Sequence, residues 1–556
     1  MEFLLARFNA QAQRRAQEVP QTASPSDVRA SSLGGVAHLD YRPDIDGLRA
    51  IAVLSVVAFH AFPAVVRGGF VGVDVFFVIS GYLISGILFT SLERKRFSFL
   101  QFYARRIRRI FPALALVLFA CLAAGWFLLF SNEYARLGKH VAGSAGFVAN
   151  LVLWNESGYF DKAAATKPLL HIWSLGIEEQ FYFVWPFLLY IIWKRRFWTP
   201  VVLAGIFIAT FWINIYTAGS GNTAADYYSP LTRFWELAAG ALLAYFSLYK
   251  IAPNPLITKL PAPAARVFAA AAAPDPFINN LKAMAGLIAV LLAVFLVDEA
   301  GGYPGWWALL PVGGTYLMLS AGPKAWLNKR ILANRLMVAV GLISYPLYLW
   351  HWPLLSFMRI VDGKAPAAPA AALAILLSVV LAWGTYILIE KPIRWGGSGA
   401  IKALFLIAVM GVMADAGYYV YISKGVPSRN PAAEDLMAAQ KDIDIGETRV
   451  VAGLQERAGT YHGLDGAMMI GTPGTDETLL IGDSTMYQYI PRVRQYAEQH
   501  RAQMEHNLFV VVGLGACLTL PDITNPASPA CAEFMDKAIA AAHLPSVKTV
   551  GFAALW

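Results

Sequence analysis

Charged residues are scarce in this chain. Of its 556 residues, 15% are charged and 57% are hydrophobic, whereas a soluble domain carries about 25% charged residues. This scarcity excludes an ordinary soluble protein and is typical of a chain that crosses a membrane several times. The formal net charge of +9 comes from short loops between apolar segments, so the positive-inside rule explains it better than nucleic-acid binding.

A cleavable signal peptide and abundant cysteine are also missing. The apolar run near 3–5 is too short for a signal sequence, so residues 1–40 are expected to form a cytoplasmic tail. Of the 3 cysteines, Cys121 is expected to pack as an apolar residue. Cys517 and Cys531 flank a loop rich in Pro, Asn and Ser, which predicts a disulfide in an oxidising compartment; two free buried thiols are the alternative.

Long apolar segments dominate the first three quarters of the chain. They predict about ten to eleven transmembrane helices, with eleven candidate segments. Segment 137–154 is interrupted by glycines, Lys139 and His140, and is therefore placed at the outer surface. The basic loops fall on one side if the N-terminus is cytoplasmic, which puts the C-terminal region outside. The predicted spans are 47–66, 69–91, 110–130, 173–193, 199–217, 231–248, 283–298, 305–321, 336–357, 367–389 and 401–423.

The last part of the chain has a different pattern. Residues 424–475 read as a periplasmic linker, and 476–556 as a soluble domain. Strands are predicted at 478–481, 509–512 and 547–552, with a helix at 486–500 after the first of them. This alternation predicts an α/β domain of three layers.

Arg49 and His60 lie eleven positions apart in the first apolar segment. Three helical turns separate them, so they share one face about 16 Å apart along the axis. Ionisable groups in membrane helices usually face a bundle interior or a pathway. His60, with Arg49 and Asp46 nearby, is therefore a candidate base or acyl carrier; a histidine satisfied by a neighbouring helix is the alternative.

Arginines begin the third span. Arg106 and Arg109 are three residues apart, hence adjacent on a helix. Guanidinium pairs can bind phosphate in a bidentate manner. Positive-inside topology or contact with lipid headgroups explains the same pattern without a ligand.

A third group combines His171 with Glu178 and Glu179 at the start of the fourth span. His171 and Glu178 are two helical turns apart on one face, and a carboxylate there could orient an imidazole. A structural salt bridge is the alternative.

Two further motifs are weaker. Tyr348, Trp350 and His351 fit an aromatic belt at the membrane interface or a sugar-binding platform. Gly482, Asp483 and Ser484 follow a predicted strand, where a serine nucleophile and its oxyanion hole can form.

Together these residues resemble acyltransferase family 3, the membrane O-acyltransferases of bacterial surface polysaccharides. The resemblance covers residues 41–395, with one additional span at 396–423. The C-terminal region resembles the SGNH hydrolase-like domain fused to part of that family. The motifs that carry the resemblance are Tyr41 to Ala50, Arg49 with His60, Gly72 to Gly81, Arg106 with Arg109, Trp173 to Tyr182, Tyr348 to Pro353 and Glu390 to Arg394.

The resemblance implies a multi-pass enzyme of the bacterial inner membrane. It implies acetyl-CoA or another acyl-CoA as co-substrate, held near Arg49, Arg106 and Arg109. His60 would act in the transfer, supported by Glu178 or Glu179. The acceptor would be a cell-surface or lipid-linked glycan such as lipopolysaccharide, and Asp74 would order the pocket or form a salt bridge. Membrane lipids are expected as partners; nucleic acid, a bound cofactor and a metal are not.

The C-terminal region departs from the SGNH pattern. Thr485 follows Ser484, and His500, His506 and His543 form no Asp-x-x-His motif. The expectation is a truncated domain or one that is not an independent hydrolase. A proton-coupled transporter and an inactive assembly scaffold are the alternative functions. The first is disfavoured by the absence of an evident inverted repeat, and the second by the intact Arg49, His60 and Glu178.

Overall fold

The computed structural model describes most of the chain, in two units. The units are Met1–Gly425 and Val426–Trp556. The predicted tail at 1–40 lies outside the described residues. These are 41–157, 164–194, 198–221, 223–249, 275–298, 302–394, 399–429, 449–451, 454–472, 476–482, 486, 489–500, 507–514 and 530–553.

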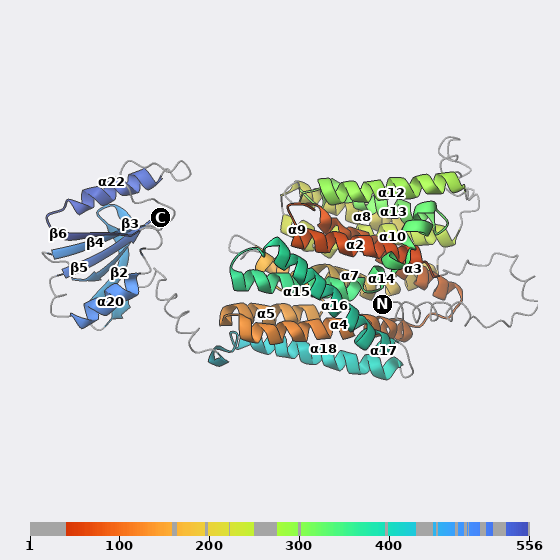
Figure 1. Cartoon of the computed structure of the whole chain (residues 1–556), viewed down its shortest axis with the longest axis horizontal. Coiled ribbons are helices and arrows are strands. Elements are labelled where there is room, and N and C mark those ends of the chain that lie inside the picture. Colours follow the sequence, from red (N-terminus) through yellow and green to blue (C-terminus); the bar gives the residue numbers. More distant parts are fainter. Residues whose placement is uncertain are drawn as a thin grey trace, which may run out of the picture. The chain divides into compact units, whose positions relative to one another are not determined.

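The first unit is helical throughout its described residues (Figure 1). Its α-helices are α2 (Pro43–Ala61), α3 (Gly72–Glu93), α4 (Phe99–Leu128), α5 (Ser131–Ala145), α6 (Ala149–Glu156), α7 (Ile172–Trp193), α8 (Thr199–Gly219), α9 (Thr223–Tyr228), α10 (Pro230–Leu248), α12 (Pro276–Leu296), α13 (Leu309–Ala321), α14 (Arg335–Leu342), α15 (Ser344–Asp362), α16 (Ala368–Thr385), α17 (Lys391–Arg394) and α18 (Gly399–Ile422). Short 3-10 or π-helical turns join them: η2 (Gly69–Val71), η3 (Ala164–Thr166), η6 (Gly305–Ala308), η7 (Asn328–Leu332) and η8 (Tyr386–Glu390), while η9 (Pro427–Arg429) belongs to the second unit.

Each of the eleven predicted spans contains a helix. Among the described residues, six helical segments are long and apolar enough to cross a membrane, or seven if the bent pair α14 and α15 counts as one. The chain is therefore a polytopic membrane protein. The predicted count of about eleven also included α2, α7, α10 and α13. Of these, α2 carries Asp44, Asp46 and Arg49, and α13 has only 13 residues.

Apolar and polar helices occupy different positions in this unit. In α8, α12 and α18 only 17%, 28% and 22% of the spanning window is buried by protein, so most of each surface is left for lipid. In contrast, α3 is 67% buried. The helices α2, α7 and α10 bury carboxylates, arginine and aromatic rings in the interior. Polar groups thus gather where protein, rather than lipid, surrounds them.

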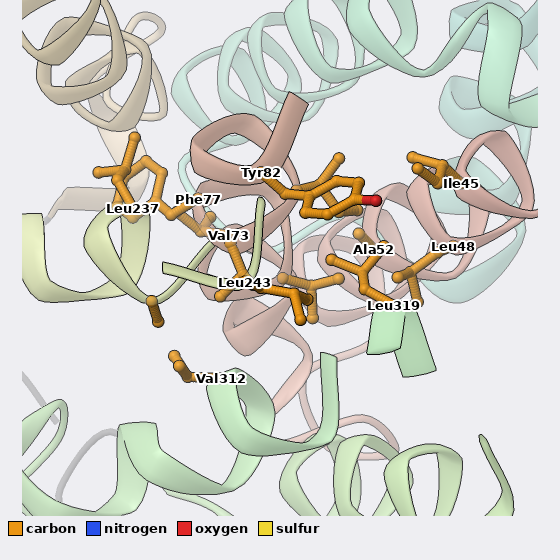
Figure 2. Close-up of a cluster of buried hydrophobic side chains, with 14 of the residues drawn as sticks. Ile45, Leu48, Ala52, Val73, Phe77, Tyr82, Leu237, Leu243, Val312 and Leu319 are labelled. Carbon is orange, nitrogen blue, oxygen red and sulfur yellow. The ribbon is translucent and has the colours of Figure 1, made fainter. Parts of the chain in front are cut away.

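A tightly packed core joins α2, α3, α10 and α13 (Figure 2). Glycines allow the close approach of α3 and α10: a Cβ at Gly240 would lie 2.1 Å from the carbonyl oxygen of Val78, and one at Gly81 would lie 1.9 Å from that of Leu237. Such small-residue contacts are typical of membrane helix pairs. Side chains such as Leu48, Phe77 and Leu237 fill the space between the helices.

Segment 137–154, predicted at the outer surface, forms the end of α5 and most of α6. Gly138 of α5 faces Gly417 of α18, and a Cβ on either would meet the other's carbonyl oxygen at 2.6 to 2.7 Å. Gly138, one of the glycines that interrupt the apolar pattern, therefore lies at a contact between α5 and α18.

The second unit is a mixed sheet with helices on both faces (Figure 1). Strand order is β1-β2-β3-β5-β4-β6, with β4 parallel to β5 and β6, and β3 antiparallel to β5. One face packs on α22 and the other on α20, which confirms the predicted three-layer architecture. The bounds are β1 (Arg449–Val451), β2 (Leu454–Tyr461), β3 (Leu464–Gly471), β4 (Asp476–Gly482), α20 (Ile490–Gln499), β5 (Asn507–Gly513), α22 (Ala530–Ala542) and β6 (Val547–Ala553).

The predicted linker at 424–475 was wrong in its second half. Residues 449–471 form β1 to β3, an antiparallel meander that extends the sheet beyond β5. The apolar run of β3, Ala467 to Ile470, is only four residues long and is preceded by Asp465 and Gly466, so its strand signal was weaker than that of the parallel strands.

Candidate functional site

Among the cavities of the helical unit, two have linings that include residues of α2. The first, here called the arginine pocket, has a volume of about 90 Å³ and includes Arg49, Arg106 and Arg109 in its lining. The second, called the histidine cavity, has about 530 Å³ and includes His60 and His171. The eleven-residue separation on α2 thus carries Arg49 into one cavity and His60 into the other, as their axial distance requires.

Three helices supply the charges of the arginine pocket. Arg49 comes from α2 and pairs with Asp46 at 3.3 Å. Arg106 and Arg109 come from α4, and the guanidinium of Arg106 lies 4.3 Å from the ring centre of Tyr182. A planar guanidinium held on an aromatic face is pre-organised to bind an anion with its remaining donors.

The carboxylates of Glu178 and Glu179 on α7 complete this pocket. Glu178 accepts hydrogen bonds from the hydroxyl groups of Ser80 and Tyr182. One oxygen of Glu179 is buried without a hydrogen-bond partner among the described residues. With three arginines and two glutamates in the lining, ionised side chains leave an excess positive charge, which suits an anionic ligand.

The sequence predicted that Glu178 or Glu179 supports His60, but both glutamates line the arginine pocket, whereas His60 lines the histidine cavity. His171 precedes α7 and lines the histidine cavity, whereas Glu178, two turns further along the helix, lines the arginine pocket. Two turns correspond to about 10 Å. His171 and Glu178 therefore lie in different cavities, although their spacing places them on the same face of a helix.

The histidine cavity is aromatic. The ring centres of His60 and Trp352, which both line it, lie 4.4 Å apart. The rings in the lining are Phe59, Phe70, Trp173, Tyr227, Tyr228, Tyr303, Tyr348 and Trp352. Apolar ring faces combined with hydroxyl groups suit the alternating faces of a sugar.

A hydrogen-bond chain fixes the tautomer of His60. Nδ1 of His351 lies 3.2 Å from the carbonyl oxygen of Leu347, and Nε2 of His351 lies 2.8 Å from Nδ1 of His60. A carbonyl only accepts, so in neutral His351 the proton is on Nδ1 and Nε2 accepts from His60. Neutral His60 then carries its lone pair on Nε2, the arrangement that a general base requires.

Tyr348 and Val73 line both cavities and separate them. The hydroxyl of Tyr348 donates to the carbonyl oxygen of His171 at 2.6 Å and lies 2.7 Å from Oγ of Ser174. His171 itself is buried, and neither of its ring nitrogens has a hydrogen-bond partner among the described residues. Val73 and the Tyr348 ring, which is held by its hydroxyl group, are therefore the residues that the two cavities share.

Other residues proposed from sequence have structural contacts. Asp74 lines neither cavity: it pairs with Arg233 at 3.0 Å and accepts from Tyr303, so the salt-bridge alternative is the one observed. Trp350 donates to Thr385. Asp483, Ser484 and Cys517 lie outside the described residues, Cys531 is disulfide-bonded, and Cys121 is a buried free thiol.

Sequence reasoning missed two arginines. Arg233 lies in an apolar span, and its buried ion pair could have been found by the rule already applied to His60. Arg359 lines the histidine cavity from α15 and gave no sequence signal, because it stands near the helix end where basic residues are common.

Comparison with known proteins adds an independent finding. The model of a family described as "Acyltransferase domain" matches residues 42–387. A Bacillus subtilis (strain 168) protein named "Putative peptidoglycan O-acetyltransferase YrhL" is 32% identical over 372 residues, covering 65% of this chain and 56% of the relative. The Listeria monocytogenes "Peptidoglycan O-acetyltransferase OatA" is 28% identical over 399 residues, covering 69% of this chain and 60% of the relative. The chain thus spans little more than half the length of these relatives, and no solved structure matches it.

Proposed function

The chain belongs to the acyltransferase family whose model covers residues 42–387, and on that premise we propose that it is an integral inner-membrane O-acyltransferase. It moves an acetyl group from cytoplasmic acyl-CoA to a hydroxyl group of a periplasmic or lipid-linked saccharide. The relatives named as O-acetyltransferases support this activity and do not favour a transporter.

The observation that carries the proposal is the pair of cavities divided by Tyr348. An acyl-CoA donor brings phosphates and a thioester, and the arginine pocket offers three guanidinium groups. The phosphates would meet these arginines, with the thioester directed toward Tyr348, which lines the same pocket.

The histidine cavity is the proposed acceptor side. Nε2 of His60 takes the proton of the saccharide hydroxyl as its oxygen attacks the thioester carbonyl. The new ester C–O bond forms, the C–S bond breaks, and the proton passes to the departing thiolate. His351 holds His60 in the tautomer that makes Nε2 the base.

The experiment uses inside-out membrane vesicles that contain the protein, with radiolabelled acetyl-CoA added to the exposed cytoplasmic face. Label should enter the lipid-linked or glycan fraction in wild type and fall by a factor of about 10² to 10⁴ in His60→Ala at matched expression. Equal label in the two proteins would remove His60 from the mechanism. Label from wild type only when donor is supplied to the opposite face would contradict the proposed direction.

A further inference from the structure

Arg359 is the unexplained charge of the histidine cavity. It projects from α15 into the described lining, its guanidinium lies 5.5 Å from the ring centre of Trp352, and its Nη2 donates to the carbonyl oxygen of His60 at 3.1 Å. The same residue thus touches the backbone of the proposed base and an aromatic wall of the acceptor cavity.

The charge of Arg359 is not balanced within the described part of the chain. No carboxylate there lies within ion-pair distance of it, in contrast to Arg42, Arg49 and Arg233. Its Nε is buried and has no hydrogen-bond partner among the described residues. An arginine stays charged at any physiological pH and has five N–H donors, of which the bond to the His60 carbonyl uses one.

The rest of the described cavity lining is neutral or histidine. A half-buried cation in a cavity of about 530 Å³ with aromatic walls suits a ligand that has both a sugar-like body and an anionic group. The phosphates of the donor are accounted for on the other side of Tyr348, where three arginines line the pocket.

Resting on the function proposed above, we propose that Arg359 binds an anionic oxygen group, phosphate or carboxylate, on the acceptor saccharide. Its contact with the His60 carbonyl places that group beside the base. Arg359 is therefore a specificity-determining residue: it selects charged acceptors and orients their hydroxyl group toward Nε2 of His60.

A purely structural role is the competing explanation. His60 is in the last turn of α2, and Arg359 is placed to stabilise that helix end through its carbonyl. The two roles differ in what they predict. A helix cap affects all acceptors equally, whereas an anion contact affects charged acceptors alone.

The test uses the full chain in proteoliposomes of neutral lipid, with three probes of similar size: methyl N-acetylglucosaminide, N-acetylglucosamine 1-phosphate and N-acetylmuramic acid. Wild type should show a KM at least about tenfold lower for the phosphate or the carboxylate probe than for the neutral one. Arg359→Gln should raise that KM about tenfold and leave the neutral KM unchanged. The probe that responds identifies the anionic group.

Arg67→Gln is the matched control, because Arg67 is an exposed arginine just beyond the same end of α2 and does not line the cavity. It should change none of the three KM values. If Arg359→Gln folds poorly, Arg359→Lys keeps the charge and should retain the preference with a weaker effect. Adding anionic lipid to the proteoliposomes shows whether a headgroup competes for the site, seen as a rise in the KM of the charged probe alone.

Two outcomes overturn the inference without touching the proposed function. In one, wild type transfers to neutral and charged probes with equal KM. In the other, Arg359→Gln lowers transfer to all three equally, as a helix cap would. Absence of His60-dependent transfer to every probe would instead contradict the proposed function, and the inference would fall with it.

Discussion

The two cavities of the helical unit differ in how their polar groups are satisfied. In the arginine pocket, guanidinium and carboxylate groups face one another across α2, α4 and α7, and aromatic hydroxyls complete the network. In the histidine cavity, aromatic rings dominate; among the described residues the ring nitrogens of His171 have no hydrogen-bond partner, and Arg359 has no carboxylate within ion-pair distance. One helix, α2, contributes Arg49 to the first and His60 to the second, because eleven residues move a side chain three turns along its axis.

The largest effect is expected from breaking the buried ion pairs of Arg233. Arg233→Leu leaves Asp74 and Glu236 buried without their cation, since both lie within 3.2 Å of it. The loss should be about 3–5 kcal/mol of stability, seen as a lower midpoint of thermal aggregation in detergent. Arg105→Leu, at an exposed arginine outside both cavities, is the control. An unchanged midpoint in Arg233→Leu would show that the ion pair is not needed for folding.

The second prediction concerns the tautomer of His60. His351→Leu removes the acceptor for Nδ1 of His60, so the turnover number should fall about tenfold or more while donor KM stays the same. His351→Gln keeps an acceptor oxygen and should recover part of the rate. If both variants lose activity equally, His351 acts through packing rather than through the hydrogen bond.

The third prediction removes the wall between the cavities. Tyr348→Ala widens the passage between them that acyl transfer requires, so water should reach the thioester and donor hydrolysis without acceptor should rise several-fold. Tyr348→Phe loses only the bonds to Ser174 and the His171 carbonyl and should stay close to wild type in hydrolysis. Free thiol released from acetyl-CoA measures both. Hydrolysis that does not rise in the alanine variant would mean that the cavities do not communicate at Tyr348.

The sequence predicted which charged residues matter, but not how the helices around them pack. Arg49, Arg106 and Arg109 were found because charges in apolar helices stand out, and the structure places all three in one pocket. The position of Glu178 was misjudged, because helical periodicity gives the face of a helix but not the neighbouring helix at each depth. Sequence could not show that Tyr348 would separate two cavities, since that depends on how α3, α7 and α15 pack.

The smallest predicted effect lies outside both cavities. Glu156 at the end of α6 contacts Lys139 at 2.8 Å, His140 at 2.8 Å and Lys167 at 3.4 Å. Burial alone would raise its pKa, but hydrogen bonds and charges from His140 and Lys139 outweigh it, so the net pKa is lowered from 4.5. Because the pKa of Glu156 is lower in the folded state than in the unfolded state, its ionised form stabilises the protein at pH values above the unfolded-state pKa. This stabilisation is lost as the pH falls through the folded-state pKa.

At pH 7 the free energy of unfolding of wild type should therefore exceed that of Glu156→Gln by about 1–2 kcal/mol. This difference in stability should narrow progressively below pH 4.5. Thermal unfolding midpoints of both proteins, measured from pH 7 to below pH 4.5, test this prediction. Glu133→Gln is a control, because Glu133 lies on the neighbouring helix α5 and its side chain accepts from the backbone of Phe130 instead. A gap that is constant with pH would exclude the ion-pair explanation.

The central claim is that the arginine pocket binds the donor and the histidine cavity performs the transfer. The most direct measurement compares donor affinity and single-turnover acyl transfer in wild type, Arg106→Gln and His60→Gln, with Arg105→Gln as the exposed control. We expect Arg106→Gln to weaken acetyl-CoA binding about tenfold with transfer from the bound donor retained, and His60→Gln to bind donor normally and lose transfer. Loss of donor binding in His60→Gln, or normal binding in Arg106→Gln, would contradict the division of labour between the two cavities.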